Sequence, residues 1–167
     1  MRSSCVGLAA SGLLACAASA AGVLQQRAPD FALAAFQGDN VRLSEYRGQP
    51  VVLSFWNSRC GTCAKQLQEL DRLYGTYRSA GLIVLAVGID DDPQRAADYA
   101  SDHHVAFPLL FDQTKSVARA YDVARLPSTL LIDRSGIVRY LHSDDGADDR
   151  TLVRQVRELL DDRLGNP

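Results

Sequence analysis

The sequence predicts an α/β fold in which a mixed β-sheet lies between helices. Residues 51–56 form a short apolar run rich in β-branched and aromatic residues, which is typical of a buried strand. After this run, apolar side chains recur at helical spacing, at Cys63, Leu67, Leu70, Tyr74 and Tyr77. A second continuous apolar run, over residues 82–89, favours a buried parallel strand beside the first. Strands and helices that alternate in this way predict helices packed against a sheet.

Composition and charge predict one globular domain. The chain has 167 residues, of which 47% are hydrophobic and 23% charged, and these are ordinary values for a folded domain. We assign that domain to residues 23–167. The formal net charge of −2 argues against nucleic acid as a partner, because such partners need clustered Lys and Arg.

Residues 1–22 are predicted to be a secretory signal. Arg2 is followed by a short apolar stretch and then by small residues up to Gly22, and the apolar part is too short to be a permanent membrane span. Two cleavage sites compete. Residues 18–20 suit ordinary signal peptidase, whereas residues 13–16 resemble a bacterial lipobox, which would leave Cys16 as a lipid anchor. A retained N-terminal helix is the alternative to both.

A β-hairpin is expected ahead of the central strand, as an N-terminal extension. Two short apolar runs, residues 31–36 and 41–43, are joined by a turn sequence at residues 38–40. Ser44 can then cap one helical turn before residues 48–50 redirect the chain.

The second half of the chain continues the α/β pattern. The acidic residues 90–92 supply an N-cap and Pro93 a first helical position, for a helix that ends near His104. The remaining expected elements are a strand over 107–111, a short helix over 114–121, a hairpin of strands 128–133 and 137–141, and a last helix from Asp148 or Asp149. That helix places Leu152, Val156, Leu159 and Leu160 on one face.

Cys60 and Cys63 are the candidate reactive groups. They are expected on the first turn of the helix that leaves the central strand, where unpaired N–H groups and the helix dipole favour a thiolate. Cys60 would attack a disulfide and Cys63 would resolve the mixed disulfide. A zinc half-site or a purely structural disulfide is the alternative. Zinc needs four ligands, with His103, His104 and His142 as the other candidates, and a bridge over so few residues is a poor staple.

Three motifs in order resemble the thioredoxin fold: Phe55-Trp56, the Cys60-Gly61-Thr62-Cys63 sequence, and residues 125–129 (RLPST) before a strand. The opening APDF, the LSEYRGQPVVLSFW passage and the acidic IDDDP segment resemble the exported TlpA/ResA/DsbE-like branch. The resemblance covers residues 28–160. It implies a thioredoxin-like fold, thiol:disulfide oxidoreductase activity without a cofactor, and a cis peptide bond before Pro127.

The same resemblance implies the binding residues. The loop that carries Pro127 would lie against the cysteines and leave the backbone of Leu126 free to pair with an extended substrate segment. Without the resemblance, a trans proline before a strand would be the simpler interpretation. Substrate contacts are further expected from Trp56, Arg59, Gly61 and Thr62.

Some positions depart from the family pattern. Arg59 stands where thioredoxins usually have Trp, and its charge should favour the Cys60 thiolate. Ser54 replaces a buried Asp that moves protons for the second cysteine, and Gln66 replaces the Glu that serves in ResA-like proteins. Glu69 acting through water is one candidate substitute, and direct exchange with solvent is the other.

The function that these features predict is reduction of cysteine pairs in exported proteins, such as apocytochrome c, with electrons from a membrane partner in the periplasm or on the outer face of a membrane. Two alternatives remain. One is a peroxiredoxin-type peroxidase, although Asn57 replaces the Thr or Ser, and Leu53 the Pro, which that chemistry needs. The other is a copper or assembly chaperone. The direction of electron flow, the substrate and the oligomeric state are not determined by the sequence.

Overall fold

The expected central strand is β3 (Val51–Trp56), and all six of its residues are buried. The computed structural model describes residues 22–143 and 149–161. The signal segment before residue 22, with Cys16, and the acidic residues 144–148 lie outside the described residues. The other elements, in chain order, are β1 (Ala32–Ala35), β2 (Val41–Arg42), η1 (Leu43–Tyr46), α1 (Cys63–Tyr77), η2 (Arg78–Ala80), β4 (Ile83–Gly88), α2 (Pro93–Asp102), β5 (Leu109–Phe111), α3 (Ser116–Ala120), β6 (Ser128–Ile132), β7 (Val138–Ser143) and α4 (Asp149–Asp161).

The strands form one mixed sheet in the order β2-β1-β5-β4-β3-β6-β7. Strand β3 pairs in parallel with β4 and antiparallel with β6, so it has a partner on each side. Strand β5 continues the parallel part beside β4, and the β1–β2 hairpin joins the sheet through antiparallel pairing of β1 with β5. The expected parallel pair, the N-terminal hairpin and the final hairpin are therefore confirmed.

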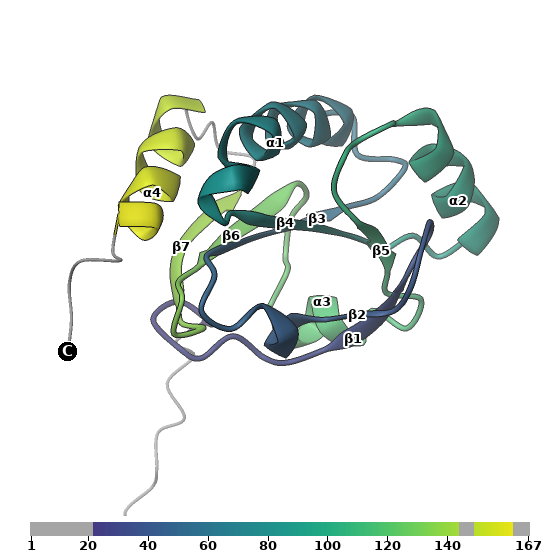
Figure 1. Ribbon diagram of the computed structural model, residues 1–167. Helices are drawn as coiled ribbons and strands as arrows, with labels where there is room; N and C mark the ends of the chain where they lie inside the picture. Colours follow the sequence, from purple (N-terminus) through teal and green to yellow (C-terminus); the bar gives the residue numbers. More distant parts are fainter. Residues whose placement is uncertain (1–21, 144–148, 162–167) are drawn as a thin grey trace, which may run out of the picture.

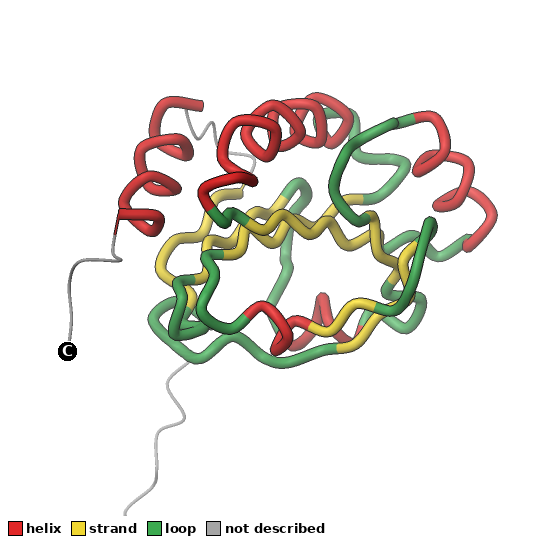
Figure 2. Tube along the Cα trace, in the orientation of Figure 1, coloured by secondary structure: helices red, strands yellow, loops and turns green. Residues whose placement is uncertain are grey.

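Helices cover both faces of the central strands. Helices α1, α2 and α4 lie on one face, and α3 lies on the other together with the β1–β2 hairpin (Figure 1). The tube in Figure 2 shows the same layers, with the central strands between them. This arrangement explains the composition of β3. Successive side chains of a strand point to opposite faces, so a strand covered on both sides must be apolar at almost every position.

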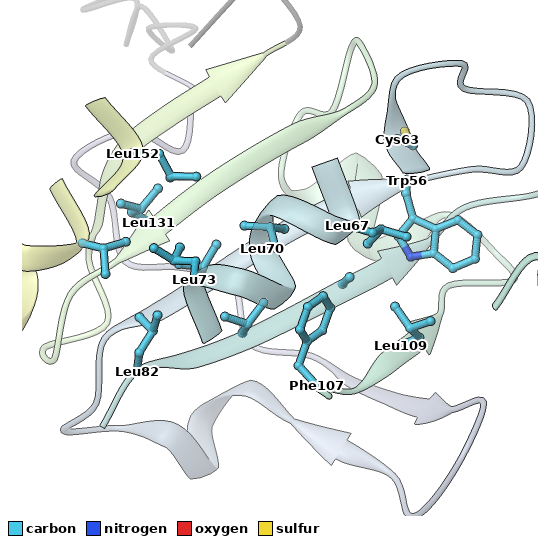
Figure 3. Close-up of a cluster of buried hydrophobic side chains, with 14 of the residues drawn as sticks. Trp56, Cys63, Leu67, Leu70, Leu73, Leu82, Phe107, Leu109, Leu131 and Leu152 are labelled. Atoms are coloured by element: carbon cyan, nitrogen blue, oxygen red, sulfur yellow. The ribbon is translucent and has the colours of Figure 1, made fainter. Parts of the chain in front are cut away.

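Each face of the sheet has its own hydrophobic core. Val52 and Trp56 of β3 belong to the core under α1 and α4, which Figure 3 shows with Leu67, Leu70 and Leu73. The alternate residues of β3 pack with α3 and the hairpin in the second core; they are Val51, Leu53 and Phe55. The four apolar residues expected on one face of α4 are buried.

The buried stripe of α1 differs from the expected one at its end. Cys63, Leu67 and Leu70 are buried as predicted, but the next buried residue is Leu73. Tyr77 is only half-buried, and its hydroxyl accepts a hydrogen bond from Arg157 Nε of α4 at 2.7 Å. The polar phenol end reaches the helix–helix surface, whereas Leu73 has no polar atom and occupies the interior position.

Of three local predictions, one is confirmed and two need correction. Asp92 caps α2 by accepting from the N–H groups of Gln94 and Arg95, as expected. Strand β5 begins at Leu109 rather than at residue 107, because Pro108 has no N–H for a ladder bond. The expectation that Ser44 caps a helical turn is wrong. Ser44 lies inside η1, and its N–H and hydroxyl donate to the Asp30 carboxylate at 2.9 and 3.0 Å.

Within residues 22–143 and 149–161, none of the helices is long and apolar enough to cross a lipid bilayer.

Gly88 is the last residue of β4, and we expect that only glycine at this position leaves room for the buried Trp56 ring. A Cβ atom at Gly88 would lie 2.8 Å from Trp56 Cζ2, which is too close for a buried ring that cannot move away. We expect Gly88→Ala to lower the free energy of unfolding by about 1–3 kcal/mol through overpacking, measured by chemical denaturation.

Gly75→Ala is the matched control. Gly75 is an exposed residue inside α1, and a Cβ atom added there would meet no other atom within 4 Å. Replacing it should raise the stability by about 0.5–1 kcal/mol, because alanine favours a helix over the unfolded chain. Equal stability changes in the two variants would contradict the proposed close approach at Gly88.

Candidate active site

The two cysteines lie where β3 ends and the chain turns into α1. They form a disulfide with an S–S distance of 2.07 Å and a Cα–Cα distance of 5.4 Å. Cys63 is the first residue of α1 and is 0% exposed, whereas Cys60 lies in the preceding turn and is half-buried. The more accessible sulfur is therefore Cys60, as expected for the attacking group.

The expectation that both sulfurs lie on the first helical turn is wrong for Cys60. Thr62 occupies the N-cap position, so the helix begins only with Cys63. The residues before it form a turn of their own, in which Cys60 N–H donates to the Asn57 carbonyl at 3.2 Å and Arg59 N–H donates to Asn57 Oδ1 at 3.0 Å. Cys60 remains adjacent to the helix N-terminus, where the dipole favours an anion.

A buried carboxylate that sequence reasoning did not assign to the site anchors this turn. Asp90 is 5% exposed, and both of its oxygens accept the N–H of Ser58, at 2.9 and 3.2 Å. The Ser58 hydroxyl donates to the same carboxylate at 2.5 Å. The position of Asp90 just after β4 could have indicated its role from the sequence. Strands β4 and β3 are parallel neighbours, so their carboxyl ends meet at the same edge of the sheet.

The loop that precedes β6 lies at the same end of β3. The Leu126–Pro127 peptide bond is cis, Pro127 is buried and Leu126 is half-buried. Ser128, the next residue, pairs with Phe55 in the β3–β6 ladder. The register thus brings Leu126 and Pro127 to the edge of the sheet from which the cysteine turn leaves.

Arg59 is exposed in the cysteine turn and has an acidic neighbour. The pKa of Asp91 is lowered mainly by its hydrogen bond and charge interaction with Lys115, and also by the charge of Arg59. Asp91 and Lys115 form an ion pair at the surface. Arg59 is therefore part of a small group of charges at the edge of the site, rather than an isolated cation beside Cys60.

Trp56 does not lie where a substrate contact would require. Its side chain is 1% exposed and stacks on Tyr99, with ring centroids 4.9 Å apart. Trp56 is the last residue of β3 and comes before the surface turn that carries the cysteines. Its burial therefore does not support the expected contact with substrate. Trp56 instead packs beneath the site. Gly61 and Thr62 are exposed, and Thr62 Oγ1 lies 3.8 Å from Cys60 Sγ.

Glu69 lies on α1, six residues after Cys63. This separation corresponds to a rise of about 9 Å along the helix, so proton exchange with Cys63 would need intervening water. The Glu69 side chain is 13% exposed, pairs with Lys65 at 3.4 Å and lines a pocket of about 190 Å³ between α1 and α4. Its role in proton transfer stays a prediction.

Ser54 forms a buried hydrogen bond with Thr129 across the β3–β6 pair. The two hydroxyl oxygens are 3.0 Å apart, and both residues are buried. Neither group titrates near neutral pH. The position where thioredoxins have an acid is therefore filled by a neutral, mutually satisfied pair, which needs no charged partner inside the core.

Taken as a chemical site, this geometry suits thiol–disulfide exchange. Half-buried Cys60 is bonded to buried Cys63 next to the N-terminus of α1. The loop that carries Pro127 and leads into β6 lies at the same end of the sheet. Within the described ranges, no three His, Cys, Asp or Glu side chains gather as metal ligands.

Comparison with protein families gives a match to the AhpC/TSA family model over residues 24–141. Among curated proteins, the chain is 36% identical over 114 residues to the thiol-disulfide oxidoreductase ResA of Geobacillus kaustophilus, a match that covers 68% of this chain and 66% of that protein. It is also 36% identical over 112 residues to ResA of Geobacillus thermodenitrificans, covering 67% and 64%. The chain thus spans just under two thirds of the length of these relatives.

A solved structure shows the same fold. A Chlorobium tepidum protein, provisionally described as the thiol:disulfide interchange protein DsbE, superposes with a TM-score of 0.76 at 32% sequence identity. The match covers 80% of this chain and 95% of that one. The predicted thioredoxin-like fold is therefore confirmed.

Removal of the Ser54 hydroxyl should destabilise the fold through its partner. We expect Ser54→Ala to lower the free energy of unfolding by about 1–3 kcal/mol, because the buried Thr129 hydroxyl is left without its bond. Chemical denaturation of Ser54→Ala, Thr129→Val and the double variant measures the coupling. The double variant should cost less than the two single changes added together.

The exposed Ser101→Ala change serves as the control and should leave the stability within about 0.5 kcal/mol of the original. Strict additivity of the Ser54 and Thr129 changes would show that the two hydroxyls do not stabilise each other.

Proposed function

Because the chain belongs to the AhpC/TSA family, we propose that it is a thiol:disulfide oxidoreductase that acts on cysteine pairs of other exported proteins. The observation that carries this proposal is the unequal burial of the two bonded sulfurs, with half-buried Cys60 preceding fully buried Cys63 at the start of α1. A substrate can reach Cys60, whereas Cys63 reacts only within the protein. That asymmetry supports a different role for each sulfur.

In the reducing direction, the Cys60 thiolate attacks one sulfur of a substrate disulfide. The substrate S–S bond breaks, a mixed disulfide forms, and the first substrate sulfur leaves as a thiolate that takes a proton from water. The Cys63 thiolate then attacks Cys60 Sγ, and the second substrate sulfur leaves in the same way. The substrate gains two electrons, and the protein is left with the Cys60–Cys63 disulfide.

The substrate segment is proposed to bind beside Leu126. The loop before β6 lies at the edge of the sheet where the cysteine turn also lies, and an extended peptide can add to exposed backbone there as a further strand. Exposed Arg59, Gly61 and Thr62 would contact the same segment from the cysteine turn. Such backbone recognition tolerates different substrate sequences.

We further propose that the protein works outside the cytoplasm. The predicted signal at residues 1–22, with a lipid anchor at Cys16 as one outcome of processing, supports export to the periplasm or to the outer face of a membrane. Each turnover leaves the disulfide, so a membrane dithiol donor would have to restore the reduced pair. Cysteine pairs of apocytochrome c are the proposed substrate class, as the resemblance of the sequence to the TlpA/ResA/DsbE-like branch implies.

A Cys63→Ser variant is expected to accumulate mixed disulfides through Cys60, because the resolving sulfur is missing. Partners are identified by mass spectrometry after expression in an exporting host and thiol-blocking lysis. The Cys60→Ser/Cys63→Ser variant is the control, since it differs from Cys63→Ser only in the loss of the attacking sulfur. Equal recovery of partners from both variants, or rapid peroxide consumption without disulfide reduction by the unmodified protein, would contradict the proposal.

Removal of the Arg59 charge should make Cys60 less reactive. The guanidinium favours the thiolate, so Arg59→Gln is expected to raise the pKa of Cys60 and slow its alkylation by about threefold below that pKa. The rate of iodoacetamide reaction, followed from pH 5 to 9 in the Cys63→Ser background, measures both quantities.

Arg95→Gln is the matched control, because Arg95 is an exposed arginine on α2 outside the cysteine turn. Its alkylation profile should coincide with that of the parent. Identical profiles for Arg59→Gln and the parent would remove Arg59 from the site.

A further inference from the structure

Asp90 is a buried carboxylate that the exchange steps do not use. It is 5% exposed and receives three hydrogen-bond contacts, all from Ser58, at 2.9, 3.2 and 2.5 Å. Burying a charge is costly unless its hydrogen bonds are satisfied. Here those bonds come from a residue of the cysteine turn, so the carboxylate and the turn are held together.

The hydrogen bonds to Ser58 limit how far the Asp90 carboxylate can lie from Cys60. Two residues span at most about 7 Å, so the oxygen bonded to Ser58 N–H lies within roughly 10 Å of the Cys60 nitrogen. Because the carboxylate is buried, salt screens it less than it screens an exposed group. A negative charge at this distance disfavours a thiolate on Cys60 and opposes the effects of Arg59 and the helix N-terminus.

The neighbouring acids have other partners. Asp91 is exposed and paired with Lys115. Asp112, which follows β5, is as deeply buried as Asp90, but it accepts from the N–H groups of Ser116 and Ala118 at the start of α3, at 3.0 and 2.9 Å. Asp112 thus resembles Asp90 in burial and bonding but holds a different element.

We propose that Asp90 is a positioning residue that fixes the turn before Cys60 and, through its charge, keeps the Cys60–Cys63 pair reducing. The negative charge of Asp90 raises the free energy of the Cys60 thiolate. The reduced protein is then less stable relative to the disulfide form, so the cysteine pair donates electrons more readily. This inference rests on the proposed function, because it concerns the same two sulfurs.

The test is the redox equilibrium of the purified protein with reduced and oxidised glutathione, which requires no protein substrate. Asp90→Asn keeps an oxygen that can accept from Ser58 but removes the charge. We expect its equilibrium constant to shift about threefold in favour of the reduced pair. Ser58→Ala removes the hydroxyl donor and keeps the charge, so its equilibrium constant should stay within about twofold of the original.

Asp112→Asn is the control for loss of a buried carboxylate. It should lower the melting temperature, as Asp90→Asn does, and shift the glutathione equilibrium by less than Asp90→Asn, because its bonds hold α3 and not the cysteine turn. An Asp90→Asn equilibrium equal to the original, or a Ser58→Ala shift as large as that of Asp90→Asn, would overturn the assignment to charge. The result does not depend on whether Cys63→Ser traps partners, so failure of the proposed function and failure of this inference are distinguishable.

Discussion

The pairing of β3 with a strand on each side is the constraint on which the site depends. Parallel pairing with β4 and antiparallel pairing with β6 hold β3 in the middle of the sheet, and its side chains are buried on both faces. The carboxyl end of β3 therefore has one fixed position. The cysteine turn begins at this end of β3. Asp90, which follows β4, and Pro127, in the loop before β6, lie at the same end of the sheet.

We propose that opposing electrostatic contributions set the reactivity of Cys60. In this proposal the N-terminus of α1 and the charge of Arg59 favour the thiolate, whereas the buried charge of Asp90 disfavours it. Arg59 is also shared with Asp91, which lowers what it can contribute to the sulfur. A balance of this kind can set the tendency of the pair to donate electrons without altering either cysteine.

The position where thioredoxins have a buried acid is neutral in this protein. Ser54 and Thr129 satisfy each other across β3 and β6, and Glu69 lies about 9 Å further along α1, paired with Lys65. Cys63 itself lies in the apolar core under α1.

The sequence by itself determined the strands, the helices and the reactive pair, because hydrophobic period, caps and the two-residue cysteine spacing are local signals. The cis peptide bond before Pro127 was predicted only from the resemblance of residues 125–129 to the thioredoxin fold. The hydrogen bonds of Asp90 to Ser58, the burial of Trp56 and the turn that keeps Cys60 out of α1 were decided only by the tertiary structure. Each of these depends on which residues distant in the chain meet at one edge of the sheet, and pairing between strands sets that, not the order of residues along one segment.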